Sequence, residues 1–494
     1  MSLKSATAAQ RAPGYRRLVL GVLMLVYACN SAQRSLIPII GQAMKVDLKL
    51  TDTQLGLLAG TAFAALYAVS GIPIARLAER FNRVSILSLS LALWSAFTTL
   101  FAVTGSFLQL LAARVGVGVG EAGCSPCAHS LISDYYQRGR RTSALSVYSC
   151  GLPLGYLFVA LVGSYVTQHA GWRAACVAVG LPGIALALLL KSLVAEPVRG
   201  HADGVPVAPA AIFSLGGELA QLAAAARALF LTWPAANIVI GLTVASFASY
   251  GSWAFIPAYF PRAFGLDYAA SGWILGIVGS VPVALGILVG GFLADLLGAR
   301  SPRWYALVPA AGLLASSPFY LLALMQSRWQ GAALLLAVPG FFQYVSLGPS
   351  FGVVQNVVAV RQRATATALL FVCLNVLALG GGALFTGFVI DQLAQSYFVH
   401  GDAGMGAAIT RALADAAAAG GAFRAACPGG AAPAGAAAEL ARSCTEALAH
   451  GSRAGIMVTL TLYVWAAAHY LLASVGLARQ LRLAAERNAA PAPA

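Results

Sequence analysis

Charged side chains interrupt two long apolar stretches of this sequence. Arg34, preceded by the neutral amide of Gln33, lies in one stretch, and Arg114 and Glu121 lie in another. An ionised side chain at membrane depth is costly unless it faces a polar cavity or a partner. These residue types therefore favour a polar pathway through an apolar protein. An arginine–carboxylate pair that only holds helices together is the alternative.

The spacing within the second stretch indicates how its charges are arranged. Arg114 and Glu121 are seven residues apart, so they share one face of a helix. Small residues around Glu121 permit close helix approach, and they form no phosphate loop because no P-loop lysine follows them. The Cys124-x-x-Cys127 motif has no second pair, which favours two buried thiols over a metal site. We expect neither a metal nor a cofactor.

Composition indicates which elements position these residues. The chain is 59% hydrophobic and only 10% charged, whereas a soluble domain carries about 25% charged residues. Apolar runs long enough to cross about 30 Å of hydrocarbon recur along it, and alternating β patterns are absent. We predict an all-α membrane protein with twelve transmembrane helices, at about residues 17–40, 53–74, 84–103, 107–132, 143–167, 173–193, 234–258, 269–294, 304–325, 331–357, 365–391 and 454–477.

The net charge of +15 comes from 31 basic against 16 acidic residues. Most of the basic residues fall in the loops on the N-terminal side of the predicted membrane, which is the positive-inside pattern rather than a nucleic-acid-binding surface. This distribution predicts cytoplasmic termini in a cell (inner) membrane. The first fifteen residues are polar, which disfavours a cleaved signal peptide.

A short motif occurs twice in the chain. Residues 75–83 (ARLAERFNR) and 291–300 (GFLADLLGAR) follow the second and eighth predicted spans, and their acidic residues Glu79 and Asp295 are 216 positions apart. Two parallel six-helix repeats are therefore expected. The predicted parts are an N-terminal half, a cytoplasmic linker with an amphipathic helix, a C-terminal half and a cytoplasmic tail, at 1–193, 194–233, 234–477 and 478–494.

Residues 392–453 form a long outward loop to which the sequence assigns no role. Loops of this length are either functional or disordered. Cys427 and Cys444 lie in it, in an oxidising compartment if the membrane is a bacterial inner membrane. A disulfide and two free thiols both remain open.

Several motifs resemble those of a known family. The second motif copy resembles the G-x-L-A-D-x-x-G-x-R signature of the major facilitator superfamily, and residues 111–122 resemble its R-x-x-x-G-x-G motif. Five stretches are more narrowly similar to spinster-type transporters. They are 50–57 (LTDTQLGL), 80–83 (RFNR), 116–126, 245–251 (ASFASYG) and 363–366 (RATA).

The resemblance implies a transporter that alternates between inward- and outward-open forms. It also implies that an Asp-Arg pair in the first span and a Glu in the fourth couple protons to substrate movement. By position, Gln33-Arg34 matches that pair and Glu121 matches the Glu. Because a primary amide does not titrate near neutral pH, protons remain an open question as the coupling ion. Family substrates in animals include lipids and lysolipids.

The repeated motif has an expected role in gating. A cytoplasmic latch is expected in each half, and a charged loop that only sets topology is the alternative. The residues concerned are Glu79, Arg80, Arg83 and Asp134 in the first half, and Asp295 and Arg300 in the second.

Aromatic and amide side chains near the middle of predicted spans suit an amphipathic ligand. Packing is the alternative for each of them. The candidates are Asn30, Tyr250, Trp253, Gln343, Tyr344 and Asn375.

Together these features favour a secondary transporter, not an enzyme, for a small amphipathic, anionic or lipid-like solute. Arg34 and Arg114 exceed the single carboxylate of Glu121 by one charge, which an acidic substrate group would balance. The alternative is a facilitative, uncoupled transporter, or a lipid scramblase or receptor on the same fold. The expected partners of the protein are its substrate and membrane lipids. We expect a monomer that binds no nucleic acid.

Overall fold

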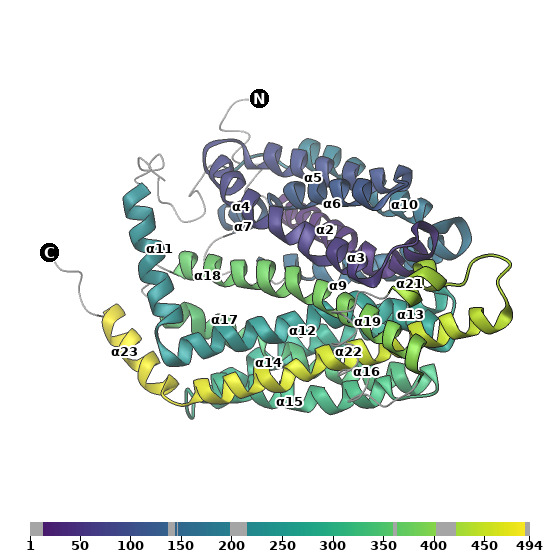
Figure 1. The fold of residues 1–494 in the computed structure, drawn as a ribbon. Coiled ribbons are helices and arrows are strands. Elements are labelled where there is room, and N and C mark those ends of the chain that lie inside the picture. The colour runs from purple at the N-terminus through teal and green to yellow at the C-terminus, as the bar shows by residue number, and fades with distance from the viewer. Residues whose placement is uncertain are drawn as a thin grey trace. The chain divides into compact units, whose positions relative to one another are not determined.

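The structure, a computed structural model, describes residues 13–136, 144–145, 147–197, 215–358, 363–401 and 421–489. Throughout these ranges the ordered elements are helices (Figure 1). The chain forms two compact units. Unit 1 comprises Met1–Leu48, Ala62–Phe213 and Asp267–Gly276, and unit 2 comprises Lys49–Thr61, Ser214–Leu266 and Ile277–Ala494.

The helices of unit 1 carry the residues of the first predicted half. They are α2 (Pro13–Leu48), α4 (Ala62–Arg80), α5 (Arg83–Leu100), η2 (Phe101–Val103), α6 (Phe107–Glu121), α7 (Cys124–Tyr135), α9 (Gly151–Phe158), η3 (Val159–Gly163) and α10 (Ser164–Leu193).

Unit 2 contains most of the second half and one short segment of the first. Its elements are α3 (Asp52–Gly56), η1 (Leu57–Thr61), α11 (Leu215–Phe230), α12 (Trp233–Phe264), α14 (Val281–Gly298), α15 (Trp304–Leu324), α16 (Trp329–Tyr344), α17 (Leu347–Asn356), α18 (Arg363–Val372), η6 (Cys373–Gly380), α19 (Gly381–His400), α21 (Ala422–Ala426), η7 (Pro428–Gly430), α22 (Ala438–Ser474) and α23 (Leu477–Ala489). Helix α13 (Tyr268–Val278) begins in unit 1 and ends in unit 2.

Among the described residues, nine helices are long and apolar enough to cross a membrane. One of them, Val147–Leu193, covers two predicted spans, and Gly171 breaks its helical backbone with φ of 82°. Two further predicted spans, 17–40 and 53–74, correspond to α2 and to the run from α3 through α4. The total of twelve spans stays a prediction.

Each unit includes a short segment from the opposite half of the chain. Residues Lys49–Thr61, before and within the second predicted span, pack in unit 2, and Asp267–Gly276, before and within the eighth, pack in unit 1. The two segments occupy matching positions in the repeat, since residues 51–60 and 267–276 are 216 positions apart. A Cβ on Gly56 would overlap the carbonyl oxygen of Ala383, and a Cβ on Gly272 would overlap that of Ala160. The same residue type thus permits the same close approach in both halves, as expected for a repeated fold.

Local capping explains where two important helices begin. The side chain of Thr51 accepts a hydrogen bond from the backbone N–H of Gln54, whose side chain accepts from the backbone N–H of Thr51. This capping box starts α3 directly before Asp52. The side chain of Asn82 accepts from the backbone N–H of Ser85 at 2.8 Å, which starts α5 at Arg83.

Several predicted segments fall partly outside the described residues. In the linker, α11 accounts for the expected amphipathic helix from residue 215 onward, and 198–214 lie outside. In the loop 392–453, α19 continues to His400, α22 begins at Ala438, and 402–420 lie outside. The structure bonds Cys427 to Cys444 with their Cα atoms 5.7 Å apart. The predicted tail contains the helix α23.

Candidate functional site

Arg34 and Glu121 form an ion pair inside unit 1. The Nη2 and Nε atoms of Arg34 lie 3.2 and 3.3 Å from Oε2 of Glu121. Glu121 is fully buried, whereas 29% of the Arg34 side chain is exposed. The carboxylate is therefore fixed in the protein interior, whereas the Arg34 side chain keeps part of its surface exposed.

Arg114 adds a second buried cation to the pair. Its Nη2 donates to the backbone carbonyl of Arg34 at 3.4 Å. The guanidinium carbons of Arg34 and Arg114 lie 4.6 and 4.9 Å from the ring centre of Phe63, and that of Arg34 lies 5.3 Å from Tyr67. Both guanidinium groups thus lie over one aromatic ring, which partly offsets their desolvation, and Arg34 also pairs with Glu121.

The glycines of α6 explain how this group comes together. A Cβ on Gly118 would lie 2.9 Å from the backbone oxygen of Phe63, so a larger residue would push α6 away from α4. The close approach places Phe63 between the arginines of α2 and α6. The sequence interpretation of these glycines as packing residues agrees with this geometry.

Gln33 has different neighbours from Arg34. Its Nε2 donates to Cys29 Sγ, Ser95 Oγ and the carbonyl of Val179 at 3.0, 3.1 and 3.3 Å, and its Oε1 accepts from Thr98 Oγ1 at 2.9 Å. These partners lie on α2, α5 and α10. The structure therefore brings Arg34, Arg114 and Glu121 together and places the fully buried Gln33 amide in the helix packing beside them. Asn30 is buried one helical turn before Arg34.

Arg83 organises a second charged group in unit 1. It forms ion pairs with Asp134 and with Glu196, the latter at 2.6 Å, and donates to Ser130 Oγ at 2.7 Å and to the carbonyl of Pro197 at 3.2 Å. The sequence analysis expected Arg83 and Asp134 but missed Glu196. The side chains of Glu79, Arg80 and Asp295 lie outside the described residues, and Arg300 is exposed.

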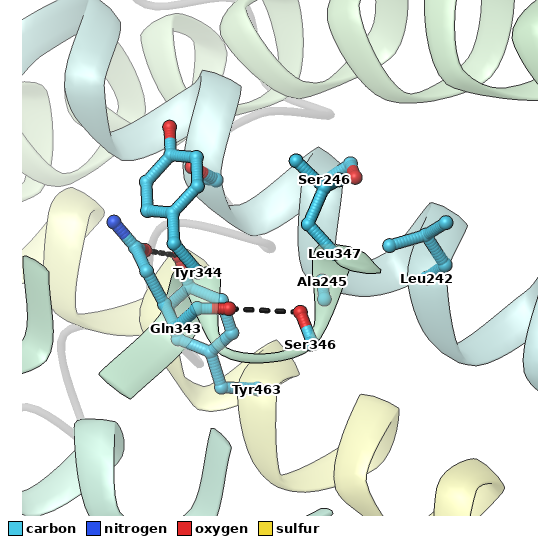
Figure 2. Close-up of a pocket in the computed structure, with 9 residues that line it drawn as sticks. Leu242, Ala245, Ser246, Gln343, Tyr344, Ser346, Leu347 and Tyr463 are labelled. Carbon is cyan, nitrogen blue, oxygen red and sulfur yellow. Dashed lines mark hydrogen bonds between the residues drawn. The ribbon is translucent and has the colours of Figure 1, made fainter. Parts of the chain in front are cut away.

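In unit 2 two of the candidates, Trp253 and Gln343, belong to one hydrogen-bonded chain. Trp253 Nε1 donates to Tyr320 Oη at 3.1 Å, Tyr320 donates to Gln343 Oε1 at 3.0 Å, and Tyr463 donates to the same oxygen. Gln343, Tyr344 and Tyr463 line a small hollow, shown in Figure 2. In the figure the side-chain nitrogen of Gln343 points away from Tyr463, which is hydrogen-bonded to the side-chain oxygen of Gln343.

The other two candidates of unit 2 lie elsewhere in the described structure. Tyr250 is 39% exposed and does not line this hollow. The amide of Asn375 donates to the carbonyl of Phe371, one turn earlier on the same stretch of chain, at 2.9 Å.

A buried charged cluster that the sequence analysis missed lies at one end of unit 2. Arg262 Nη2 lies 2.6 Å from Asp52 Oδ1, and Arg262 Nη1 donates to Ser452 Oγ at 2.9 Å. The carboxylate of Asp391 accepts from the backbone N–H groups of Asp52 and Thr53 at 3.0 and 2.7 Å. Asp391 thus caps the start of α3, where the helix dipole favours an anion.

Comparison with known proteins identifies the family. The sequence profile of the Major Facilitator Superfamily matches residues 23–382, which is most of the chain. The chain belongs to this superfamily. An MFS-type efflux pump of Mycolicibacterium smegmatis is 33% identical over 374 residues, covering 76% of this chain and 84% of the relative.

Within the superfamily the chain is spinster-like. Protein spinster homolog 1 of Homo sapiens is 28% identical and the sphingosine-1-phosphate transporter SPNS2 of Danio rerio is 26% identical, covering 78% and 76% of this chain and 75% and 76% of the relatives. A solved structure of a bacterial homologue of the human lysosomal transporter Spinster, inward-facing and unoccupied, matches with a TM-score of 0.77. It is 29% identical and covers 98% of this chain and 100% of that one. The predicted family is confirmed, and the chain is a multi-pass protein of the cell membrane.

Span boundaries explain why the analysis of this spinster-like sequence missed Asp52, Arg262 and Asp391. Hydropathy placed all three at or beyond the ends of predicted spans, where charges are usually solvated. The available signal was the Thr51-x-x-Gln54 capping box, which begins a helix at Asp52 and leaves its first backbone N–H groups in need of an acceptor.

Proposed function

We propose that this protein is a secondary transporter that moves a small amphipathic organic or lipid-like anion across the membrane by alternating access. The observation that carries the proposal is the group of Arg34, Arg114 and Glu121, in which Arg34 pairs with Glu121 and Arg114 binds the backbone carbonyl of Arg34. The formal charges of these three side chains sum to +1, and an acidic substrate group would balance that sum. Arginine suits this role because it pairs acids and phosphates bidentately and stays charged.

The names of the relatives support this class of substrate. SPNS2 of Danio rerio is named a sphingosine-1-phosphate transporter. Sphingosine-1-phosphate combines an anionic phosphate with an apolar chain. The partly exposed guanidinium of Arg34 offers a contact for the acid group, and Phe63 and Tyr67 flank it with aromatic surface.

A facilitative, uncoupled transporter is the second candidate function, and Gln33 favours it. The Gln33 amide makes hydrogen bonds through both its oxygen and its nitrogen to buried neighbours. An amide neither gains nor loses a proton near neutral pH. Glu121 is then the remaining carboxylate of this group that could exchange a proton. A lipid scramblase or a receptor on the same fold remains the wider alternative.

The proposed architecture has two six-helix halves of a twelve-span protein, with both termini in the cytoplasm. On this topology Asp52, Arg262 and Asp391 lie at the outer end and hold the start of α3 against α12 and α19. Arg83, with Asp134 and Glu196, lies at the cytoplasmic end. The two charged groups would then act at opposite sides of the membrane during alternating access, with Glu79, Arg80, Asp295 and Arg300 as further latch residues.

Uptake of sphingosine-1-phosphate into vesicles containing the purified protein tests the proposal. Arg34→Ala should weaken apparent affinity by about 2–5 kcal/mol, and Arg34→Lys should restore only part of it because lysine lacks the bidentate fork. Arg173→Ala is the matched control, since Arg173 pairs with the exposed Asp47 away from this site. If the transported solute proves neutral or cationic and Arg34→Ala leaves its affinity unchanged, Arg34 is only a structural partner of Glu121.

A further inference from the structure

An open notch lies where α12 begins and α22 gives way to α23. It encloses about 550 Å³ of empty space, its open side included, and its wall includes Trp233, Pro234, Val475, Arg479 and Leu483. Figure 1 shows α23 leaving the end of α22 at an angle. All of these residues belong to unit 2.

The backbone fixes the shape of this Trp233–Arg479 notch. Gly476 has φ of 86°, which a residue with a side chain rarely adopts, and it lets the chain turn sharply from α22 into α23. Gln480 Nε2 donates to Thr232 Oγ1 at 2.7 Å, which holds α23 to the start of α12. Leu477 and Ala484 bury one face of α23. The opposite face, with Arg479 and Leu483, is left exposed.

The side chains of the notch combine apolar surface with one positive charge. Trp233, Val475 and Leu483 are 59%, 66% and 49% exposed. The indole N–H of Trp233 donates to the carbonyl of Leu472 at 3.2 Å, so its ring is held in place. Arg479 is the charged residue of the wall. Because Gly476 has no side chain to cap α23, the first backbone N–H groups of that helix add a further preference for an anion.

The position of the notch indicates what fills it. Helix α12 begins at Trp233 and α22 ends at Ser474, and both are membrane-spanning candidates. Two spans therefore end at the notch, at the depth where lipid headgroups lie and where tryptophan is enriched. A soluble anion would pair with Arg479 but leave the apolar wall exposed to water. A phospholipid would pair with Arg479 through its phosphate and cover the apolar wall.

We propose that the Trp233–Arg479 notch binds an anionic phospholipid, with the phosphate at Arg479 and the start of α23 and the glycerol and upper acyl chain against Trp233, Val475 and Leu483. This site is separate from Arg34 and its neighbours, and the proposal does not depend on the nature of the transported solute. A basic side chain close to an anionic lipid headgroup strengthens binding by roughly fivefold, and among the residues that line the notch Arg479 is the basic one.

Thermal stabilisation of the purified full-length protein in mild detergent tests the site. The probes are dioctanoyl phosphatidylglycerol and dioctanoyl phosphatidylcholine, because a ligand of the folded state raises the melting temperature. The wild type should bind the anionic lipid more tightly. Arg479→Ala should weaken that binding about fivefold, and Leu483→Glu, which places a negative charge in the notch, should weaken it further.

Arg482→Ala is the matched control. It removes the same charge from the same helix, but Arg482 does not line the notch. Binding that stays within twofold of wild type in this variant supports the site, whereas equal losses in Arg479→Ala and Arg482→Ala would show diffuse surface attraction and overturn it. Equal binding of the two lipids by the wild type would also overturn it. Equal stabilisation by inorganic phosphate would reassign the notch to a soluble anion and refute a lipid site.

Discussion

Arg262 and Asp52 form an ion pair at 2.6 Å with side chains only 1% and 0% exposed, although they are 210 residues apart in the chain. The pair joins α12 to the start of α3, and Asp391 binds the backbone at the same point. Charges this well buried depend on one another, because removal of either partner takes away an opposite charge that offsets the desolvation of the other.

The first prediction follows from this mutual dependence. Arg262→Ala should destabilise the protein by about 3–5 kcal/mol, because the buried carboxylate of Asp52 would lose its ion pair with Arg262. The measurement is the melting temperature of the purified protein. Arg442→Ala is the control, since Arg442 pairs with Glu446 on the same helix at 81% and 49% exposure. That exposed pair should be worth only about 0.3–0.5 kcal/mol. Similar losses of stability in Arg262→Ala and Arg442→Ala would show that the buried ion pair contributes no more than the exposed one.

A second prediction concerns proton coupling. Glu121→Gln should abolish whatever pH dependence wild-type transport of sphingosine-1-phosphate has, because it removes the titratable group of the Arg34 site. Gln33→Asp should make transport more dependent on pH, since it restores a carboxyl group beside Arg34. Initial uptake rates between about pH 5 and 8 provide the measurement. Steeply proton-driven transport in the wild type that persists in Glu121→Gln would exclude Glu121 as the proton carrier.

Gln33 illustrates what the sequence could and could not predict. Consecutive residues on a helix point about 100° apart, so Gln33 and Arg34 were bound to face different neighbours. The motif resemblance singled out Gln33, Arg34 and Glu121, but only the tertiary structure shows that Arg34 pairs with Glu121 and that Gln33 meets Ser95 and Thr98. Motifs therefore named the candidate residues, whereas the orientation of each side chain depended on packing.

Segment lengths show a similar limit. Hydropathy predicted a first span at 17–40, while α2 continues to Leu48 because a helix does not have to end where its apolar run ends. Arg262 lies beyond the predicted span 234–258, although α12 continues to Phe264. Partners that are distant in sequence leave no local pattern, so the pairing of Arg262 with Asp52 could not be read from either segment alone.

A third prediction addresses the Arg83 group. Arg83→Ala should cost about 3–5 kcal/mol in stability, because Asp134 and Glu196 would each lose an ion pair with Arg83. Arg83→Lys should recover only part of this, since one ammonium group cannot reproduce donation to two carboxylates, Ser130 and a backbone carbonyl. Melting temperatures of the two variants test the geometry. A lysine variant as stable as wild type would show that charge alone matters here.

The last prediction concerns the close helix approach that recurs in both halves. Gly56→Ala and Gly272→Ala should each destabilise the protein by about 1–3 kcal/mol, because the added methyl group would overlap the carbonyl oxygens of Ala383 and Ala160. Gly291→Ala is the matched control. Gly291 also lies within a helix, but a Cβ there would meet nothing within 4 Å, so alanine should be neutral or stabilise by about 0.5–1 kcal/mol. If Gly56 and Gly291 tolerate alanine equally, the packing of α3 against α19 is looser than these contacts require, and the glycines do not define the approach.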